Sequence, residues 1–248
     1  MPVVEYVVEF IDVRKSYGSR EVLRGISFRV APGEIYCLVG PNGAGKTTTL
    51  RIAATLAKPT SGSVRILGVD LRENRDLPSI RRRISYLPEE ADVYSRLSGL
   101  EYLRFFAELY GLDVEKALDI GIRISGLSIN DLRRRAGTYS KGMRRRLLIA
   151  RVFMSEPRLA ILDEPTSGLD VFSSLQVREA IKEYSKPTGS SVILSSHNMF
   201  EVEYLCDRVA LINNGVIVGE GSVEEIKRIT GAKNLEESFV SLVSRSGG

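Results

Sequence analysis

Histidine and cysteine are scarce in this sequence, which has one histidine, His197, and two cysteines, Cys37 and Cys206, among 248 residues. The cysteines stand far apart along the chain, so they do not form the closely spaced cluster of a structural zinc site. Each lies in an apolar segment, and we interpret them as reduced core residues of an intracellular protein. A lone histidine at the end of a strand is more often structural than catalytic, and both interpretations of His197 stay open here.

Long apolar runs and a strong net charge are also missing. No run of about 18 uncharged apolar residues occurs, so we predict no membrane-spanning helix. The first six residues lack the basic segment and apolar run of a secretory signal. A net charge of +4 is too small by itself to indicate nucleic-acid binding. With 43% hydrophobic and 27% charged residues, the composition is that of a globular protein with a sizeable core.

Three arginine triplets stand out, at residues 81–83, 133–135 and 144–146. Each fits a solvated helix face, a patch that contacts phosphate, or a docking surface for a partner. The solvated face is the commonest of the three.

The first part of the chain reads as strands with one helix. Residues 7–11 and 25–30 alternate in the manner of a small antiparallel sheet. Residues 35–39 form an apolar run that leads directly into glycines, as a buried strand does. A helix is expected from 46 to about 57, followed by a strand at 63–67.

The second part begins with a helical period from about 97 to 151. Two short apolar runs, 159–162 and 192–194, indicate buried parallel strands, and the segment between them has a helical pattern. Asn214 and Gly215 predict the turn of a hairpin. These features predict an α/β protein with a mostly parallel sheet, an antiparallel N-terminal part and an inserted helical part.

The segment from Gly40 to Thr47 matches G-x-x-x-x-G-K-[ST], the phosphate-binding loop of P-loop proteins. Glycines let successive backbone N–H groups converge on one anion, and the following helix adds its positive end. Lys46 is placed to reach the terminal phosphates and Thr47 to bind Mg²⁺. The predicted ATP-binding residues of this loop are Gly40, Pro41, Asn42, Gly43, Ala44, Gly45, Lys46, Thr47 and Thr48.

Two acids follow the apolar run at 159–162. The carboxyl edge of a parallel sheet is where ligands bind in α/β proteins. Asp163 is predicted to hold Mg²⁺, and Glu164 to serve as the general base toward the γ-phosphate.

Read together with the stretch Tyr139-Ser-Lys-Gly-Met and the segment Leu162-Asp-Glu-Pro-Thr-Ser-Gly-Leu-Asp170, the chain resembles the nucleotide-binding subunits of ATP-binding-cassette (ABC) transporters. The resemblance runs from Phe10 to about Leu242. It implies a P-loop NTPase core in a single ATP-binding domain over residues 1–248. Its helical subdomain would lie at about 90–155 and a short C-terminal tail at about 222–248.

The resemblance also assigns residues that act across a dimer. The family signature is usually Leu-Ser-Gly-Gly-Gln, and here only Ser140 and Gly142 of that pattern remain. By resemblance these two residues, together with Asp170, contact the ATP held by a second subunit.

Three further roles follow from the resemblance. His197 would contact the γ-phosphate and orient water and Glu164, which makes the catalytic set Lys46, Glu164 and His197. Tyr17 would stack on adenine, although ordinary packing explains a turn tyrosine equally well. Glu89 stands where the family usually has a glutamine that touches Mg²⁺, so the predicted metal set is Thr47, Glu89 and Asp163.

The function implied is ATP hydrolysis that powers transport through separate membrane permease subunits. Export is expected, because the signature resembles those of drug, antibiotic and polysaccharide exporters. The subunit would sit peripherally on the cytoplasmic face of the membrane, pair with a second ATP-binding subunit, use ATP and Mg²⁺, and bind no nucleic acid. The alternative is an ATPase of the same class that acts on ribosomes or nucleic acid, which the arginine triplets motivate.

Overall fold

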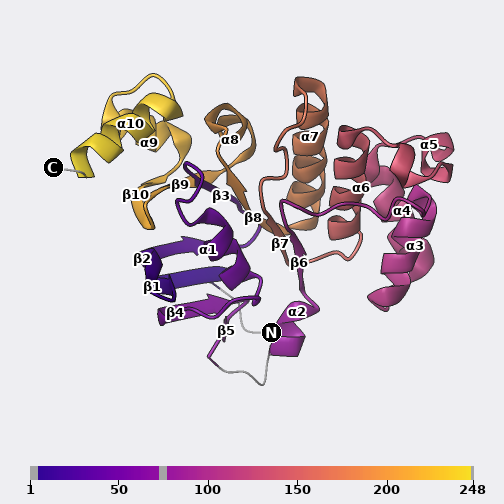
Figure 1. The fold of residues 1–248 in the computed structure, drawn as a ribbon, viewed down its shortest axis with the longest axis horizontal. Coiled ribbons are helices and arrows are strands. Elements are labelled where there is room, and N and C mark those ends of the chain that lie inside the picture. Colours follow the sequence, from indigo (N-terminus) through magenta and orange to yellow (C-terminus); the bar gives the residue numbers. More distant parts are fainter. Residues whose placement is uncertain (1–4, 73–76, 247–248) are drawn as a thin grey trace.

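The computed structural model describes residues 5–72 and 77–246 of the chain. The two ends of the predicted domain and residues 73–76 lie outside the described part. Two sheets and a set of helices build the fold, with an antiparallel sheet on one side and a cluster of helices on the other (Figure 1).

The central sheet has six strands in the order β10-β9-β3-β8-β7-β6. All neighbours pair in parallel except β10, which runs antiparallel to β9. The parallel order brings the carboxyl ends of β3, β7 and β8 to one edge, as predicted. The strands are β3 (Ile35–Val39), β6 (Ile84–Leu87), β7 (Leu159–Leu162), β8 (Ser191–Ser196), β9 (Arg208–Asn213) and β10 (Val216–Gly221).

The second sheet is antiparallel, in the order β2-β1-β4-β5, which confirms the predicted N-terminal antiparallel part. Its first strand runs well past the predicted end at residue 11. A bulge explains the difference, because Asp12 has φ +46° and the register with β2 shifts between Phe10 and Val13. The shift breaks the alternation on which the prediction relied. The strands are β1 (Val8–Tyr17), β2 (Arg20–Val30), β4 (Ser61–Ile66) and β5 (Val69–Asp70).

The helix after the phosphate-binding loop, α1 (Lys46–Ala53), ends about four residues before the predicted Ala57. Thr55 takes φ +61°, and the amides of Leu56 and Ala57 both donate to the carbonyl of Arg51. This left-handed closure stops the helix, although the apolar spacing continues beyond it.

Each buried strand of the central sheet serves two cores. Alternate residues of β3 point to opposite faces, so Ile35, Cys37 and Val39 join the core on the helical side. Tyr36 and Leu38 join the core shared with α1 and the antiparallel sheet. Burial on both faces explains why these strands read as unbroken apolar runs.

The inserted helices pack together at the side of the molecule away from the antiparallel sheet (Figure 1). Their starts are fixed by caps: Ser98 forms a capping box with Glu101, and Ser140 accepts from the amide of Met143. None of the helices in the described ranges is long and apolar enough to cross a membrane. The helices are α2 (Leu77–Arg81), α3 (Gly99–Leu109), α4 (Val114–Ser125), α5 (Ile129–Arg133), α6 (Lys141–Phe153), α7 (Val171–Thr188), α8 (Met199–Leu205), α9 (Val223–Thr230) and α10 (Leu235–Ser246).

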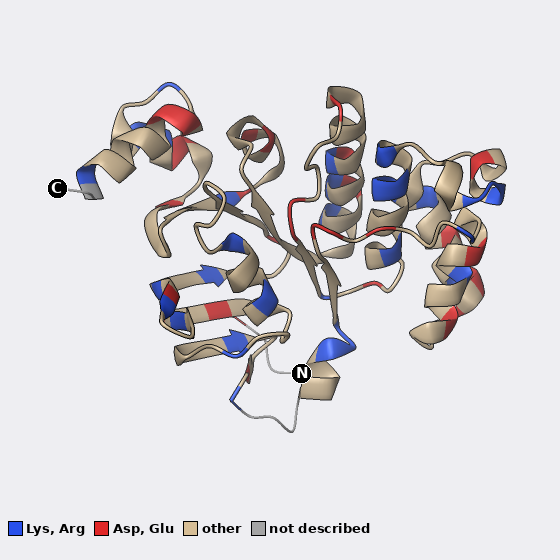
Figure 2. Cartoon of the chain, viewed as in Figure 1, with Lys and Arg blue, Asp and Glu red and all other residues tan. Residues whose placement is uncertain are grey.

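The arginine triplet on α6 is not the solvated face that we took as the commonest case. Figure 2 shows basic residues along the helix, and all three side chains of the triplet donate hydrogen bonds to backbone carbonyls, with Arg144 and Arg146 partly exposed. Arg144 donates to the carbonyl of Gly137, and Arg146 to that of Gly126. Arg145 is almost fully buried. A helix surrounded by other elements can bury a guanidinium where backbone carbonyls accept its hydrogen bonds. The local sequence cannot show where such carbonyls lie.

The two cysteines are free thiols that lie close together despite their separation in sequence. Cys37 is a core residue, as predicted, whereas Cys206 is only partly buried against the same core. Burial raises the pKa of the Cys37 thiol well above its usual value, and a hydrogen bond with Cys206 raises it further. A thiol with so high a pKa is unreactive.

The predicted hairpin turn lies against the phosphate-binding loop. Asn214 and Gly215 both have positive φ, and the amide of Gly215 donates to the carbonyl of Ala44 at 3.0 Å. A Cβ on Gly215 would lie 2.2 Å from the carbonyl oxygen of Val22. Only glycine fits at this position.

We therefore expect Gly215→Ala to lower the free energy of unfolding by at least about 2 kcal/mol, since backbone strain adds to the clash. Gly231→Ala is the matched control, because Gly231 also has positive φ but no atom lies within 4 Å of the added Cβ. The control substitution should lower the free energy of unfolding by about 1 kcal/mol. Denaturant unfolding measures both, and equal losses would contradict the steric argument.

Candidate functional site

The phosphate-binding loop joins β3 to α1 and is pressed against the neighbouring strands. A Cβ on Gly40 would lie 2.1 Å from the carbonyl oxygen of Ile212, and one on Gly45 would lie 2.7 Å from a methyl group of Leu23. Gly45 also has φ +112°, so glycine is required there for backbone as well as space. The loop shape therefore depends on the packing of β2 and β9.

Lys46 is the buried cation of this loop, with a relative exposure of 6%. Its Nζ donates to the carbonyl of Gly40 at 2.6 Å and to that of Pro41 at 3.2 Å. Glu164 Oε1 lies 3.3 Å away and forms an ion pair with it. The ammonium is thus fixed between the loop and the end of β7.

A pocket of about 360 Å³ opens over the loop. It contains Glu89 and Glu164 beside the loop residues, so the structure brings these sequence-predicted groups together. Tyr17 does not line it; its ring is half exposed, with the ammonium of Lys15 4.7 Å from the ring centre. The lining residues are Arg20, Val22, Pro41, Asn42, Gly43, Gly45, Lys46, Thr47, Thr48, Glu89 and Glu164.

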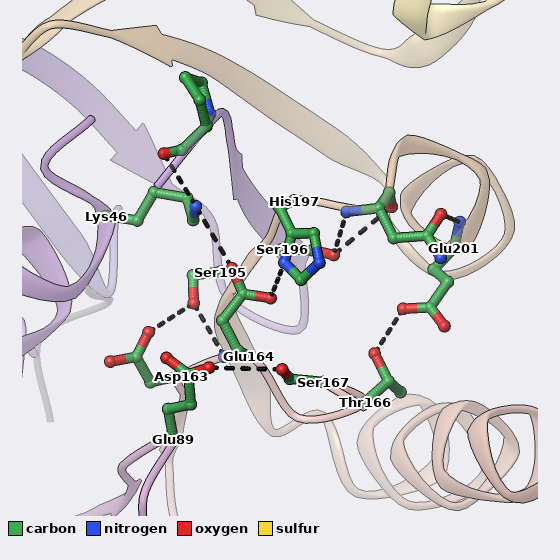
Figure 3. Close-up of polar contacts among 12 residues, drawn as sticks. Lys46, Glu89, Asp163, Glu164, Thr166, Ser167, Ser195, Ser196, His197 and Glu201 are labelled. Atoms are coloured by element: carbon green, nitrogen blue, oxygen red, sulfur yellow. Dashed lines mark hydrogen bonds and ion pairs between the residues drawn. The ribbon is translucent and has the colours of Figure 1, made fainter. Parts of the chain in front are cut away.

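Asp163 and Glu164 end β7 beside β8, where a buried serine holds both of them. Ser195 Oγ donates to Asp163 Oδ1 at 2.6 Å and accepts from the amide of Glu164 at 2.9 Å. Thr47 Oγ1 donates to the same Asp163 oxygen at 3.2 Å. Residues from β8 and α1 therefore meet at the carboxylate that follows β7; Figure 3 shows the contact of Ser195 with Asp163.

His197 lies directly against Glu164. Its Nδ1 is 2.8 Å from Glu164 Oε2, while Lys46 approaches the other carboxylate oxygen (Figure 3). The imidazole is half exposed, whereas Glu164 is 5% exposed and has φ +47°. The backbone strain at Glu164 is of the kind that functional sites retain.

The residues near Asp163 fit a magnesium ion. Mg²⁺ prefers hard oxygen donors and is usually held by one or two carboxylates together with substrate phosphates. The Thr47 hydroxyl and the Asp163 carboxylate provide such donors, and Glu89 lines the phosphate pocket together with Thr47. Within residues 5–72 and 77–246 no group of three or more His, Cys, Asp or Glu is arranged to hold a metal ion.

The residues predicted to act across a dimer lie together but apart from this pocket. Gly142 packs so closely on α7 that a Cβ would lie 2.3 Å from Ser173 Oγ. Asp170 caps α7 by accepting from the amide of Ser173 at 2.9 Å, and hydrogen bonds from Ser173 lower the Asp170 pKa. Ser140 caps α6 and is exposed. The amino ends of α6 and α7 thus form one surface.

Three residues of the site were not predicted from the sequence. Ser195 ends an apolar strand, a position where serine is unremarkable, and only strand pairing shows that it reaches Asp163. Arg145 donates to the Glu164 carbonyl at 3.1 Å, although its place in an arginine run suggested solvent. Arg20 lines the pocket from the start of β2, with no local signal beyond its charge.

Comparison with known proteins identifies the family. The sequence profile of the ABC transporter family matches residues 23–167. The bacitracin transport ATP-binding protein of Enterococcus faecalis is 35% identical over 228 residues, which is 92% of this chain and 73% of that protein. The daunorubicin/doxorubicin resistance ATP-binding protein of Streptomyces peucetius is 37% identical over 241 residues, 96% of this chain and 72% of that protein.

A solved structure, described as the ATP-binding subunit of an ABC transporter, has a TM-score of 0.82 and 32% identity, covering 96% of this chain and 99% of that one. The fold and the phosphate-binding loop define a P-loop ATPase. More specifically, the chain belongs to the ABC transporter family, among its ATP-binding proteins, which confirms the predicted resemblance.

Ser195 gives a direct test of the site. We expect Ser195→Ala to lower ATP turnover about tenfold and to raise the Mg²⁺ concentration needed for half-maximal activity, because Asp163 and the Glu164 amide both lose their partner. Ser190→Ala is the matched control, since Ser190 is equally buried but donates to the carbonyl of Pro157. A magnesium titration of ATPase activity compares them, and identical profiles would contradict the role of Ser195.

Proposed function

We propose that this chain forms one ATP-binding domain over residues 1–248, with its helical subdomain at about 90–155 and its tail at about 222–248, and that it drives export through separate membrane subunits. The observation that carries the proposal is the Glu164 carboxylate, held between Lys46 Nζ at 3.3 Å and His197 Nδ1 at 2.8 Å. The relatives named above concern bacitracin transport and daunorubicin or doxorubicin resistance, which supports export of drug-like compounds. They also favour transport over the ribosome or nucleic-acid alternative.

In this proposal Glu164 accepts the proton of the attacking water as general base. His197 fixes the orientation of that carboxylate through Nδ1 and can donate to the γ-phosphate through its other nitrogen. Lys46 leaves the loop carbonyls to bind phosphate oxygens. Magnesium, held by Thr47 and Asp163 with Glu89 beside them, would neutralise charge on the phosphates when bound.

The proposal includes a second ATP-binding subunit. The amino ends of α6 and α7 present Ser140 and Asp170 on one exposed surface, away from the chain's own pocket. A helix amino end favours negative charge, so that surface can close on the phosphates held by another copy. Exposed Val171 and Phe172 beside it supply apolar area for the contact.

The membrane partner is proposed to dock near Glu89 and the segment from Asp92 to Tyr110, which would place the chain on the cytoplasmic face of the membrane. Four large apolar side chains are exposed in that segment, those of Tyr94, Phe105, Leu109 and Tyr110, and the Tyr94 and Phe105 rings lie 5.8 Å apart. Exposed apolar groups gathered in one segment mark interaction sites.

The base role of Glu164 predicts that Glu164→Gln lowers turnover by about 10²–10⁴-fold while ATP still binds. Without hydrolysis the ATP-bound dimer should accumulate, because ATP is what joins the two copies. Steady-state ATPase assays and size-exclusion chromatography with ATP measure both effects. Glu90→Gln serves as control, since Glu90 is exposed and does not line the phosphate pocket. Full turnover in the Glu164 variant would remove Glu164 from this role.

The docking proposal predicts that Leu109→Glu reduces retention of the subunit on membranes that carry its permease by about tenfold, because a buried charge opposes docking. ATPase activity of the purified subunit should change less than about twofold. Val240→Glu on α10 is the control, as Val240 and Leu109 are similarly exposed at 64% and 63%. Equal retention of both variants on co-expressed membranes would place the docking surface elsewhere.

A further inference from the structure

Arg145 is a buried cation that ties three segments together. It lies on α6 with a relative exposure of 6%, and its Nη2 donates to the carbonyl of Glu164 at 3.1 Å and to that of Glu89 at 3.3 Å. One side chain therefore joins the helix that carries Ser140 to the loops after β6 and β7. A buried guanidinium needs such acceptors, because an unpaired charge inside a protein is costly.

Two hydrogen bonds hold the backbone of Glu164, one at its amide and one at its carbonyl. Ser195 accepts from the Glu164 amide, and Arg145 donates to the Glu164 carbonyl. Glu164 has φ +47°, a strained conformation for a residue other than glycine, which persists only when its surroundings impose it. Arg145 is part of those surroundings without touching the carboxylate that faces Lys46.

The second nitrogen of the guanidinium, Nη1, is buried and has no hydrogen-bond partner. Arg145 lines a pocket of about 530 Å³ together with Glu89, Glu90 and Asp92. Glu89 also lines the phosphate pocket beside Lys46. Glu89 thus lines two pockets, one shared with Lys46 and the other with Arg145, and Ser167 Oγ donates to its carboxylate at 3.3 Å.

The charges of Arg145 and Glu89 interact. Burial lowers the pKa of the Arg145 guanidinium, and the Glu89 carboxylate is the largest of the charges that oppose this shift, ahead of Asp163, Asp92 and Glu164. A neutral side chain at either position would leave the other charge less well compensated.

We propose that Arg145 is a positioning residue for hydrolysis: it fixes the Glu164 backbone, and its charge balances Glu89 so that a carboxylate can stand beside the phosphate site. This inference rests on the proposed ATPase function of the same site. Because Arg145 belongs to α6, a movement of the helix that carries Ser140 is passed to Glu164 through one side chain.

A double-mutant cycle on Glu89 and Arg145 tests the proposal. We expect Arg145→Gln to lower kcat at least about tenfold, with KM for ATP changed less than about threefold, because positioning affects the chemical step more than ATP binding. Glu89→Gln should stay within about tenfold of the unaltered chain and weaken the dependence on Mg²⁺. The double variant should be at least about fivefold faster than Arg145→Gln alone, since neither charge is then unbalanced.

Two further variants sharpen the result. Arg145→Lys keeps the charge and should be at least about threefold faster than Arg145→Gln. Arg144→Gln is the matched control from the same helix, because Arg144 is partly exposed and makes no contact with Glu164, and should retain activity within about twofold. Independent, multiplying losses in the double variant, or unchanged kcat in Arg145→Gln, would overturn the proposal.

Thermal melting without nucleotide separates this inference from the ATPase proposal. Arg145→Gln should lower the Tm by about 5 °C, and adding Glu89→Gln should restore part of that loss. If the unaltered chain does not hydrolyse ATP, the proposed function is wrong. The melting temperatures of the single and double variants still test the coupling between Arg145 and Glu89, because they do not depend on hydrolysis. Melting shifts that simply add would show that the two charges are not paired.

Discussion

A buried carboxylate has to be compensated by an opposite charge or by hydrogen bonds, and that requirement organises this molecule. Glu164 is 5% exposed and lies between an ammonium and an imidazole that come from other parts of the chain. Lys46 follows β3, Glu164 follows β7 and His197 follows β8, and these are adjacent, parallel strands of the central sheet. The sheet order is therefore what supplies the compensation, and a carboxylate at the end of an isolated strand would have none.

The same constraint explains how the inserted helices belong to the site. They pack on the helical side of the central sheet, on a core separate from that of the antiparallel sheet. Arg145 crosses from α6 to the loops that carry Glu89 and Glu164. The helices are thus joined to the edge of the sheet that carries Glu164 by polar contacts as well as by apolar packing, and the polar contacts depend strictly on direction and distance.

The sequence predicted those parts of the fold and site that depend on short-range patterns. The strands at 35–39 and 159–162 were placed correctly, because residues buried on both faces form uninterrupted apolar runs. The glycine-rich loop was recognisable because its backbone tolerates few other residues. The bulge at Asp12 was missed, as was the role of Ser195, since both depend on a neighbouring strand. Arg145 was missed for the same reason, because its acceptors are carbonyls far away in the chain.

The residues of the central sheet are divided between two apolar clusters, and this division affects which substitutions the protein can accept. Neighbouring residues such as Tyr36 and Cys37 belong to different clusters, although they share one strand. A volume change in one cluster reaches the other only by moving the strand backbone, which is held by hydrogen bonds on both edges. The two interiors can therefore accept substitutions almost independently, so one layer can be remodelled by mutation while the other keeps its packing.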